Sequence, residues 1–254
     1  MTGRELDGRR ALVTGSARNI GREIALELAR AGAAVMVTAR TSQAEADDVV
    51  AEIRANGGRA SSHVADVSTP DGAAALVAAT EAALGGLDIL VNNAAVRREV
   101  DFADLGWAEW REVLGVALDG AYLCTHAALP HLIRSSGVGA VINIGGLSAH
   151  VGAARRAHVL AAKAGLVGLT RALAHDLSAH GVTVNCIAPG LINTVRSEGS
   201  TSGGAPSHHA HHTTLVGRRG ETHDIAAMVR FLCGPDARYV TGQTVHVNGG
   251  AYLG

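Results

Sequence analysis

Short apolar runs alternate along this chain with longer segments whose apolar residues recur at helical spacing. In the longer segments, Ile20, Ile24 and Leu28 fall on one helical stripe, and Val49 and Ile53 repeat the pattern. The short runs are rich in Val, Ile and Ala, which is typical of strands buried on both faces. They cover residues 10–13, 34–38, 87–92, 138–144 and 182–188. The repeated order of strand, helix and strand predicts an α/β fold with a mostly parallel sheet and helices on both faces.

Composition and charge narrow the class of protein. The 254 residues are 47% hydrophobic and 18% charged, which is enough apolar content for a large core. Lys and Arg number 22 against 23 acids, and a net charge of -1 argues against nucleic-acid and polybasic membrane partners. No apolar run approaches the ~20 residues of a membrane span. The first seven residues carry acids instead of an apolar signal segment, so we expect a cytoplasmic protein.

One stretch breaks an otherwise even composition. Residues 196–214 are rich in Ser, Gly and His and hold little that a core needs, which predicts a flexible loop. Elsewhere no repeat or Pro-rich linker interrupts the chain, so we expect a single domain over residues 1–254. The three cysteines, at positions 124, 186 and 233, are scattered without the spacing of metal ligands. We expect them to be buried thiols of a reducing compartment.

A glycine-containing turn follows the first predicted strand directly. Residues 14–21 read TGSARNIG and lead into the first predicted helix. Glycines at such a junction let backbone N–H groups approach a pyrophosphate, which the N-terminus of the helix also attracts. The position of the turn between strand and helix predicts a dinucleotide site.

With this turn the sequence resembles the short-chain dehydrogenase/reductase family, whose glycine motif has the form T-G-x-x-x-G-x-G. Thr14, Gly15 and Gly21 match that motif, and Asn19 stands at its middle glycine. Asn is one of the few residues that tolerate a positive φ, so we expect the turn to survive this change. The resemblance implies one Rossmann-type, doubly wound domain with a seven-stranded sheet.

Further motifs of the family follow in order. The segment 65–67 resembles its adenine-contacting stretch, 92–95 its N-N-A-G signature, 189–194 the stretch along the nicotinamide, and 241–250 its closing strand. The resemblance therefore implies a set of cofactor-binding residues. They are Gly15, Arg18, Asn19, Ile20, Gly21, Arg40, Asp66, Val67, Asn92, Ala94, Lys163, Pro189, Gly190, Ile192 and Thr194.

The charge near the second predicted strand indicates which nucleotide is bound. An acid at the end of this strand usually holds the ribose 2′-hydroxyl of NAD, whereas a 2′-phosphate needs a cation. Here the strand ends at Arg40, no acid follows before Glu45, and Arg18 adds a second positive charge from the glycine turn. The two arginines favour NADP(H).

The catalytic residues of the family are mostly missing. Its members use Asn, Ser, Tyr and Lys, and the segment AAKAGL at 161–166 resembles the helix that carries the lysine, which gives Lys163. The tyrosine position four residues earlier holds Val159, the serine position holds Gly146, and the asparagine position holds Ala117. Since a positioned general acid contributes ~10²–10⁴ in rate, a standard ketone reductase would be crippled by these changes.

Other polar side chains offer substitutes for the missing groups. Ser148 lies two positions after the lost serine, and His158 directly precedes the tyrosine position, although both also suit a structural role. Arg155 is a weaker candidate for binding an anionic or enolate oxygen. The loop offers four histidines as part of a substrate lid, without the acid or Cys neighbours of a metal site, so we expect no metal. They are His208, His209, His211 and His212.

Three functions remain open at this point. The leading one is an NADPH-dependent oxidoreductase with an atypical site, acting on a carbonyl, imine or enone-type group of a small apolar or phenolic molecule. The second is a redox-neutral isomerase, dehydratase or cyclase on the same fold. The third is a catalytically inactive binding subunit. The resemblance also implies a homotetramer or homodimer, because family members commonly assemble through long helices.

Overall fold

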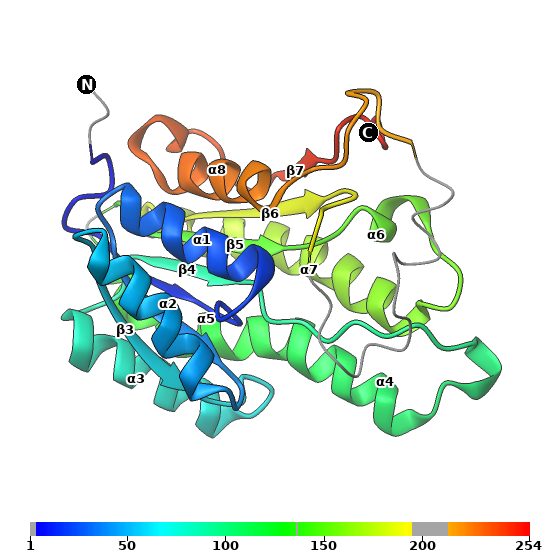
Figure 1. Cartoon of the computed structure of the whole chain (residues 1–254), viewed down its shortest axis with the longest axis horizontal. Helices are drawn as coiled ribbons and strands as arrows, with labels where there is room; N and C mark the ends of the chain where they lie inside the picture. Colours follow the sequence, from blue (N-terminus) through cyan, green and yellow to red (C-terminus); the bar gives the residue numbers. More distant parts are fainter. Residues whose placement is uncertain (1–3, 136, 195–212) are drawn as a thin grey trace.

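Seven parallel strands form the centre of the molecule. The computed structural model describes residues 4–135, 137–194 and 213–254. The strands lie in the order β3-β2-β1-β4-β5-β6-β7, which is the doubly wound order (Figure 1). The predicted fold class is therefore confirmed. The strands are β1 Arg10–Val13, β2 Ala34–Ala39, β3 Arg59–Val64, β4 Ile89–Asn92, β5 Ala140–Ile144, β6 Thr183–Pro189 and β7 Thr244–Val247.

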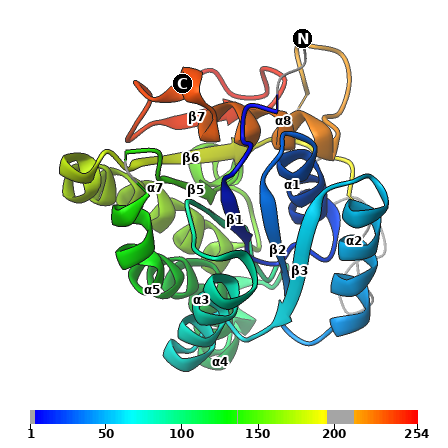
Figure 2. The ribbon, with the colours of Figure 1, turned by 90° about the vertical axis from the view of Figure 1, so that its left-hand side faces the viewer.

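Helices cover both faces of the sheet, as Figure 2 shows. One buried cluster lies under α1, α2 and α8, and the other lies under α3, α5 and α7. Alternate residues of a strand serve opposite clusters: Val13 belongs to the first and Leu12 to the second. The helices are α1 Asn19–Arg30, α2 Gln43–Ala55, α3 Pro70–Leu84, α4 Trp107–Leu114, α5 Gly120–Arg134, α6 Ser148–Val151, α7 Ala157–Leu177 and α8 Thr222–Cys233.

A π-helical turn, Gly115–Asp119, joins α4 to α5. The joined segment Trp107–Arg134 has 28 residues and a mean hydropathy of 1.2, and within the described residues it is the one helix long and apolar enough to cross a membrane. Half of its apolar window is buried inside the protein. The segment is therefore more apolar than the sequence led us to expect. Burial of half of its apolar window inside the protein explains much of this apolar content.

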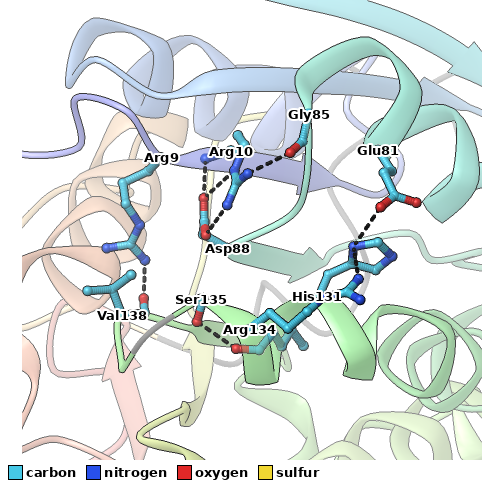
Figure 3. A network of polar contacts seen from close by, with 10 residues as sticks. Arg9, Arg10, Glu81, Gly85, Asp88, His131, Arg134, Ser135 and Val138 are labelled. Atoms are coloured by element: carbon cyan, nitrogen blue, oxygen red, sulfur yellow. Dashed lines mark hydrogen bonds and ion pairs between the residues drawn. The ribbon is translucent and has the colours of Figure 1, made fainter.

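The amino ends of the strands are held by a network of charged groups (Figure 3). Arg10 on β1 donates from Nε and Nη2 to the two carboxylate oxygens of Asp88, both at 2.8 Å. Its backbone N–H also donates to Asp88, at 2.9 Å, and its Nη1 donates to the carbonyl of Gly85 at 2.7 Å. The Asp88 side chain is only 4% exposed. This edge of the sheet is therefore closed by matched charges.

The carboxyl ends of the parallel strands meet at the opposite edge. The segments that follow β1, β2, β3, β4, β5 and β6 all begin there, and these are the segments in which the sequence predicts site residues. In open sheets of this kind, ligands bind at the carboxyl ends of the strands, where the strand order reverses. Here the order reverses between β1 and β4.

Candidate active site

The turn between β1 and α1 brings backbone close to backbone. Gly15 has a φ of 62° and Asn19 a φ of 50°, both in the left-handed region. At Gly21 an added Cβ would lie 2.3 Å from the carbonyl oxygen of Gly15, so only glycine fits there. The prediction that Asn19 tolerates a positive φ is confirmed.

Residues directly after β4 hold this turn in place. Asn93 donates from Nδ2 to the carbonyl oxygens of Thr14 and Gly15, both at 2.9 Å. The Thr14 hydroxyl oxygen accepts from the backbone N–H groups of Asn93 and Ala94, at 2.9 and 3.0 Å. The ends of β1 and β4 are thereby fixed side by side, and Asn93 is a positioning residue that was absent from the predicted set.

The first turn of α1 is open to an anion. It carries no acidic side chain, and Ile20 anchors it in the core with 3% exposure. The unpaired N–H groups and the positive end of the helix dipole favour negative charge at such a terminus. The residues predicted here, from Gly15 to Gly21, can therefore hold the phosphates of a nucleotide.

The two arginines predicted to select the nucleotide both pair with acids. Arg18 donates from Nε to Glu45 at 2.5 Å, and Arg40 Nη1 lies 3.6 Å from a carboxylate oxygen of Glu112. The side chains of Arg18 and Arg40 are 50% and 52% exposed, so both pairs remain open to solvent. Exposed ion pairs contribute little stability, and a phosphate can compete for either guanidinium.

The segment after β3 holds a preformed carboxylate. Asp66 Oδ1 accepts from the backbone N–H of Ser68 at 3.0 Å and from its hydroxyl at 2.6 Å. These hydrogen bonds lower the pKa of Asp66, and the Arg40 charge lowers it further. Val67 is 7% exposed and joins the core. The adenine-contacting role expected of Asp66 and Val67 remains a prediction.

Asn92 serves the scaffold more directly than the cofactor. Its Nδ2 donates to Asn143 Oδ1 at 2.9 Å and to Thr125 Oγ1 at 3.1 Å, and Asn143 in turn donates to Thr170 at 2.9 Å. Asn92 is 6% exposed and Asn143 is fully buried. The chain of amides links β4 and β5 to α5 and α7, so its effect on the site is to place the strand ends.

The segment after β6 runs against the end of β7. Gly190 donates its N–H to Val247 at 3.0 Å, and a Cβ on Gly190 would lie 2.6 Å from the backbone of Asn248. Ile192 is 7% exposed and pairs with Gly220 in an isolated bridge. Pro189, Gly190 and Ile192 thus lie at the carboxyl edge, and Thr194 is the last described residue before a gap.

The positions that resemble the family's catalytic residues lie on three elements, and the loss of three catalytic side chains there remains a prediction. Ala117 lies in the π-helical turn, and π-turns are frequent at functional sites. Gly146 follows β5, and an added Cβ there would meet nothing within 4 Å. Val159 and Lys163 lie one turn apart on α7, with 3% and 7% exposure. The backbone thus offers defined places for these four positions, and their match to the family's catalytic residues remains a prediction.

Lys163 is buried at the end of β5. Its ammonium group donates to the carbonyl oxygen of Ile144 at 2.5 Å. Burial lowers the pKa of Lys163 to about 7, and the positive charges of Arg97 and Arg156 add to this effect, while the Cys186 thiol opposes it. A lysine with such a pKa can gain or lose a proton near neutral pH.

The two predicted substitutes have different surroundings. Ser148 begins α6 and is 8% exposed, directly after Leu147, whose N–H donates to Pro189 at 2.9 Å. His158 has no exposed surface and lies against α4, with Nε2 3.7 Å from Glu109. Burial lowers the pKa of His158, and the Glu109 charge opposes this. The helical position of His158 turns it away from the stripe that carries Lys163.

Sequence reasoning missed Arg97 and Arg156. Arg97 follows the N-N-A-A segment, and Arg156 precedes α7 by one residue. The available signal was the position of Arg156 directly before the helix that carries Lys163, where its backbone is not helical. We instead singled out Arg155, whose Nε lies 3.3 Å from Asp101 at the surface.

The predicted lid lies almost entirely outside the described residues. This holds for His208, His209, His211 and His212, and for most of 196–214. Thr214 is described, and its hydroxyl donates to the carbonyl of Arg218 at 2.7 Å. Among the described residues, the one group with metal-ligand geometry is Glu23, Glu27 and His223, which lie on α1 and α8.

Comparisons with known proteins define the family. The family model described as "Enoyl-(Acyl carrier protein) reductase" matches residues 15–252. The 3-oxoacyl-[acyl-carrier-protein] reductase FabG of Staphylococcus aureus is 38% identical over 247 residues, which are 96% of this chain and 98% of that protein. FabG of Vibrio cholerae is 36% identical over 252 residues, 98% of this chain and 99% of the relative. The chain belongs to the short-chain dehydrogenase/reductase family, as its motifs predicted.

Solved structures agree with this assignment. A short chain dehydrogenase from Burkholderia cenocepacia in complex with NADP has a TM-score of 0.89 and 37% identity, and covers 97% of this chain and 99% of its own. A blue fluorescent protein from a metagenomic library in complex with NADPH has a TM-score of 0.89 and 33% identity. The match covers 98% of this chain and 100% of that protein's chain. This likeness extends over the whole Rossmann sheet described above.

Proposed function

We propose that this protein is an NADPH-dependent reductase that works without the tyrosine of its family. The observation that carries the proposal is the burial of Lys163, at the position that resembles the family's lysine, in a chain whose glycine turn has the expected left-handed backbone. Val159 stands at the position that resembles the family's tyrosine. When bound, the reduced nicotinamide would supply a hydride. The substrate would be a small apolar or phenolic molecule with a carbonyl, imine or enone-type group.

The residues present suit this nucleotide. The turn from Gly15 to Gly21 and the acid-free start of α1 would bind the pyrophosphate, and Arg18 and Arg40 would bind a 2′-phosphate. Lys163 would bind the ribose hydroxyls and place positive charge beside the nicotinamide. The complexes of relatives with NADP and NADPH support the same choice.

The substrate class follows from the missing acid. A reduction that leaves a strongly basic alkoxide needs a proton at once, and Val159 has none to donate. Quinones and phenolic ketones leave an anion that their own conjugation stabilises, so they require less help. Ser148 remains our candidate for polarising the carbonyl, and the lid at 196–214 for covering the substrate.

We also propose a homo-oligomer, in which a tetramer or dimer buries the outer faces of the long helices. Tyr122 on α5 is 51% exposed and Phe231 on α8 is 45% exposed. Such side chains suit packing across a two-fold axis. Light scattering of the purified protein would give its mass, and a monomer at micromolar concentration would contradict this part of the proposal.

Nucleotide binding tests the proposed function. NADPH and NADH are titrated separately into the protein while nicotinamide fluorescence is followed. We expect tight binding of NADPH and at least tenfold weaker binding of NADH. A charged contact with the 2′-phosphate contributes on the order of tenfold in affinity, and NADH lacks this phosphate. Failure to bind either nucleotide would contradict the proposal and favour a redox-neutral or non-catalytic role.

A further inference from the structure

A fully buried histidine lies where α7 packs against α4. The side chain of His158 has no exposed surface, and among the described residues neither of its ring nitrogens has a hydrogen-bond partner. Glu109 on α4 faces the ring, with Oε1 3.7 Å from Nε2, which is too far for a hydrogen bond. Two buried polar atoms therefore lie between the helices without the partners that such atoms ordinarily have.

The surroundings of this ring favour its neutral form. A protonated imidazole carries two N–H donors, and burial without acceptors makes its charge costly. Glu109 supplies negative charge from one side, but its side chain is 26% exposed, so solvent screens part of that charge. Arg98, after β4, and Arg156, directly before α7, add to the effect of burial. Burial has the largest effect, and it lowers the pKa of His158.

A second contact between these segments is weaker. The backbone N–H of Val100 donates to the carbonyl oxygen of Arg155 at 2.9 Å, and Arg155 Nε lies 3.3 Å from Asp101. The side chains of this ion pair are 49% and 61% exposed, so the pair contributes little stability. The buried packing around His158 therefore matters more for holding α4 against α7 than this ion pair does.

Both segments at this junction also carry residues of the candidate site. Lys163 lies five residues after His158 on α7. Asn93, which holds the glycine turn, lies in the segment that connects β4 to α4. Because a helix moves as a rigid element, a change in the packing of α4 on α7 reaches both residues.

We propose that His158 is an acid-sensitive positioning residue, which packs α4 against α7 as a neutral ring and loosens the two helices when it gains a proton. The proton comes from solvent and binds to a ring nitrogen, and no other bond changes. The consequence for nucleotide binding rests on the proposed function, because it acts through Lys163 and the glycine turn. The loosening of the two helices is independent of that function.

The direction of the pH effect follows from burial. The ordinary pKa of histidine is 6.5, and the pKa of His158 in the folded protein lies below it. As pH falls below 6.5, the loosened chain takes up a proton before the packed junction does, so acid favours loosening. At neutral pH the ring is uncharged and the junction is intact.

The two tryptophans of the chain report on this junction. Trp107 and Trp110 both lie on α4, on either side of Glu109. Their fluorescence is followed in the full protein from pH 8 to pH 5, above the pKa of ordinary carboxyl groups, with far-UV circular dichroism as a check on folding. We expect the wild type to show a fluorescence transition with a midpoint below pH 6.5.

Two substitutions by phenylalanine form a matched pair. His158→Phe keeps an aromatic ring at the junction without a titratable nitrogen, and His175→Phe makes the same change at an exposed position of α7. We expect the first variant to lose the fluorescence transition and the second to keep it. A transition retained in His158→Phe, or lost in His175→Phe, would contradict the inference.

Glu109→Gln tests the same inference if His158→Phe does not fold. It removes the charge that opposes the effect of burial, so the midpoint of the transition should move to lower pH by about one unit. An unchanged midpoint in Glu109→Gln would show that the transition belongs to another group.

NADPH binding separates this inference from the proposed function. The Kd for NADPH is measured at pH 7.5 and pH 5.5 in the wild type and in both phenylalanine variants. We expect the rise in Kd on acidification to be smaller in His158→Phe than in the other two, by about threefold or more. Equal rises in all three would contradict the effect on the site. If NADPH binds to none of them at either pH, the proposed function fails, and the fluorescence transition still decides the role of His158.

Discussion

The two edges of the sheet use charge in opposite ways. At the amino edge, Arg10 and Asp88 match each other atom for atom, and the buried carboxylate has a partner for both oxygens. At the carboxyl edge, the buried ammonium group of Lys163 donates to the carbonyl oxygen of Ile144, and burial lowers its pKa to about 7. The same strands connect both edges, so the difference arises from the surroundings of each charge. The Arg10–Asp88 pair stabilises the fold, whereas burial of Lys163 makes its charged form costly.

Restoring the family's acid should produce the largest effect. Gly146→Ser with Val159→Tyr returns the hydroxyl and the phenol beside Lys163, and Gly146 has open space for a side chain. We expect NADPH-dependent reduction of cyclohexanone to rise by ~10²-fold or more, because a positioned acid contributes that much. The rate of NADPH oxidation measures it.

Gly145→Ser combined with Val159→Tyr is the matched control for this variant. A Cβ at Gly145 would lie 2.8 Å from the Cys186 sulfur, so the serine there should strain the site without aiding catalysis. A doubly restored protein that binds NADPH and still fails to reduce cyclohexanone would show that the frame of the site is not retained.

Breaking the matched edge should cost stability without affecting nucleotide binding. Asp88→Ala leaves Arg10 without its carboxylate and removes an acceptor for a backbone N–H. We expect the free energy of unfolding to fall by about 3 kcal/mol in urea denaturation. Asp119→Ala, which removes an exposed partner of Arg111, should change it by less than about 1 kcal/mol. An equal loss of unfolding free energy in Asp88→Ala and Asp119→Ala would contradict a stabilising role for the Arg10–Asp88 pair.

Removing the buried charge of Lys163 should stabilise the protein. The pKa of Lys163 is about 7 in the folded state against 10.5 for the ordinary group. Between these values the unfolded chain binds a proton that the folded chain does not, so wild-type stability rises with pH over this window and is lowest below pH 7.

Lys163→Met abolishes that dependence. We expect the variant to be more stable than the wild type by about 2 kcal/mol at pH 6, with the difference shrinking toward pH 10. Urea denaturation at the two pH values measures it. A variant that is less stable at pH 6 would show that the ammonium group is fully compensated in the folded state.

The exposed arginines should give the smallest effect. Arg40→Gln and Arg18→Gln each remove one cation that would contact the 2′-phosphate, so NADPH affinity should fall by about tenfold while NADH affinity changes little. Arg22→Gln breaks an ion pair with Glu52 on the same side of the fold and serves as the control. A parallel loss of NADH affinity would assign Arg40 and Arg18 a structural role.

Local patterns predicted the sheet and the nucleotide turn well. Strand periodicity, the glycine turn and the positive φ of Asn19 all depend on residues close together in sequence, and these expectations were confirmed. The loss of three catalytic side chains, inferred from motif spacing, stays a prediction.

The sequence alone could not predict contacts between segments that are far apart in the chain. The pairing of Arg40 with Glu112 joins segments 72 residues apart. The direction of His158 depends on how α7 packs on α4, since neighbouring helical residues point ~100° apart. Arg156 was overlooked for Arg155 because one residue before a helix decides which side chain is buried: Arg156 is 9% exposed, whereas the Arg155 side chain is 49% exposed.

Reduction of a quinone tests the central claim most directly. The wild-type protein is mixed with NADPH and a naphthoquinone, and then with NADPH and cyclohexanone, while NADPH oxidation and product are both quantified. We predict one NADPH oxidised per hydroquinone formed and no reaction with cyclohexanone, because only the first product leaves a stabilised oxyanion. Two results would contradict the central claim. In the first, NADPH binds tightly but neither the quinone nor cyclohexanone causes its oxidation. In the second, cyclohexanone is reduced as fast as the quinone.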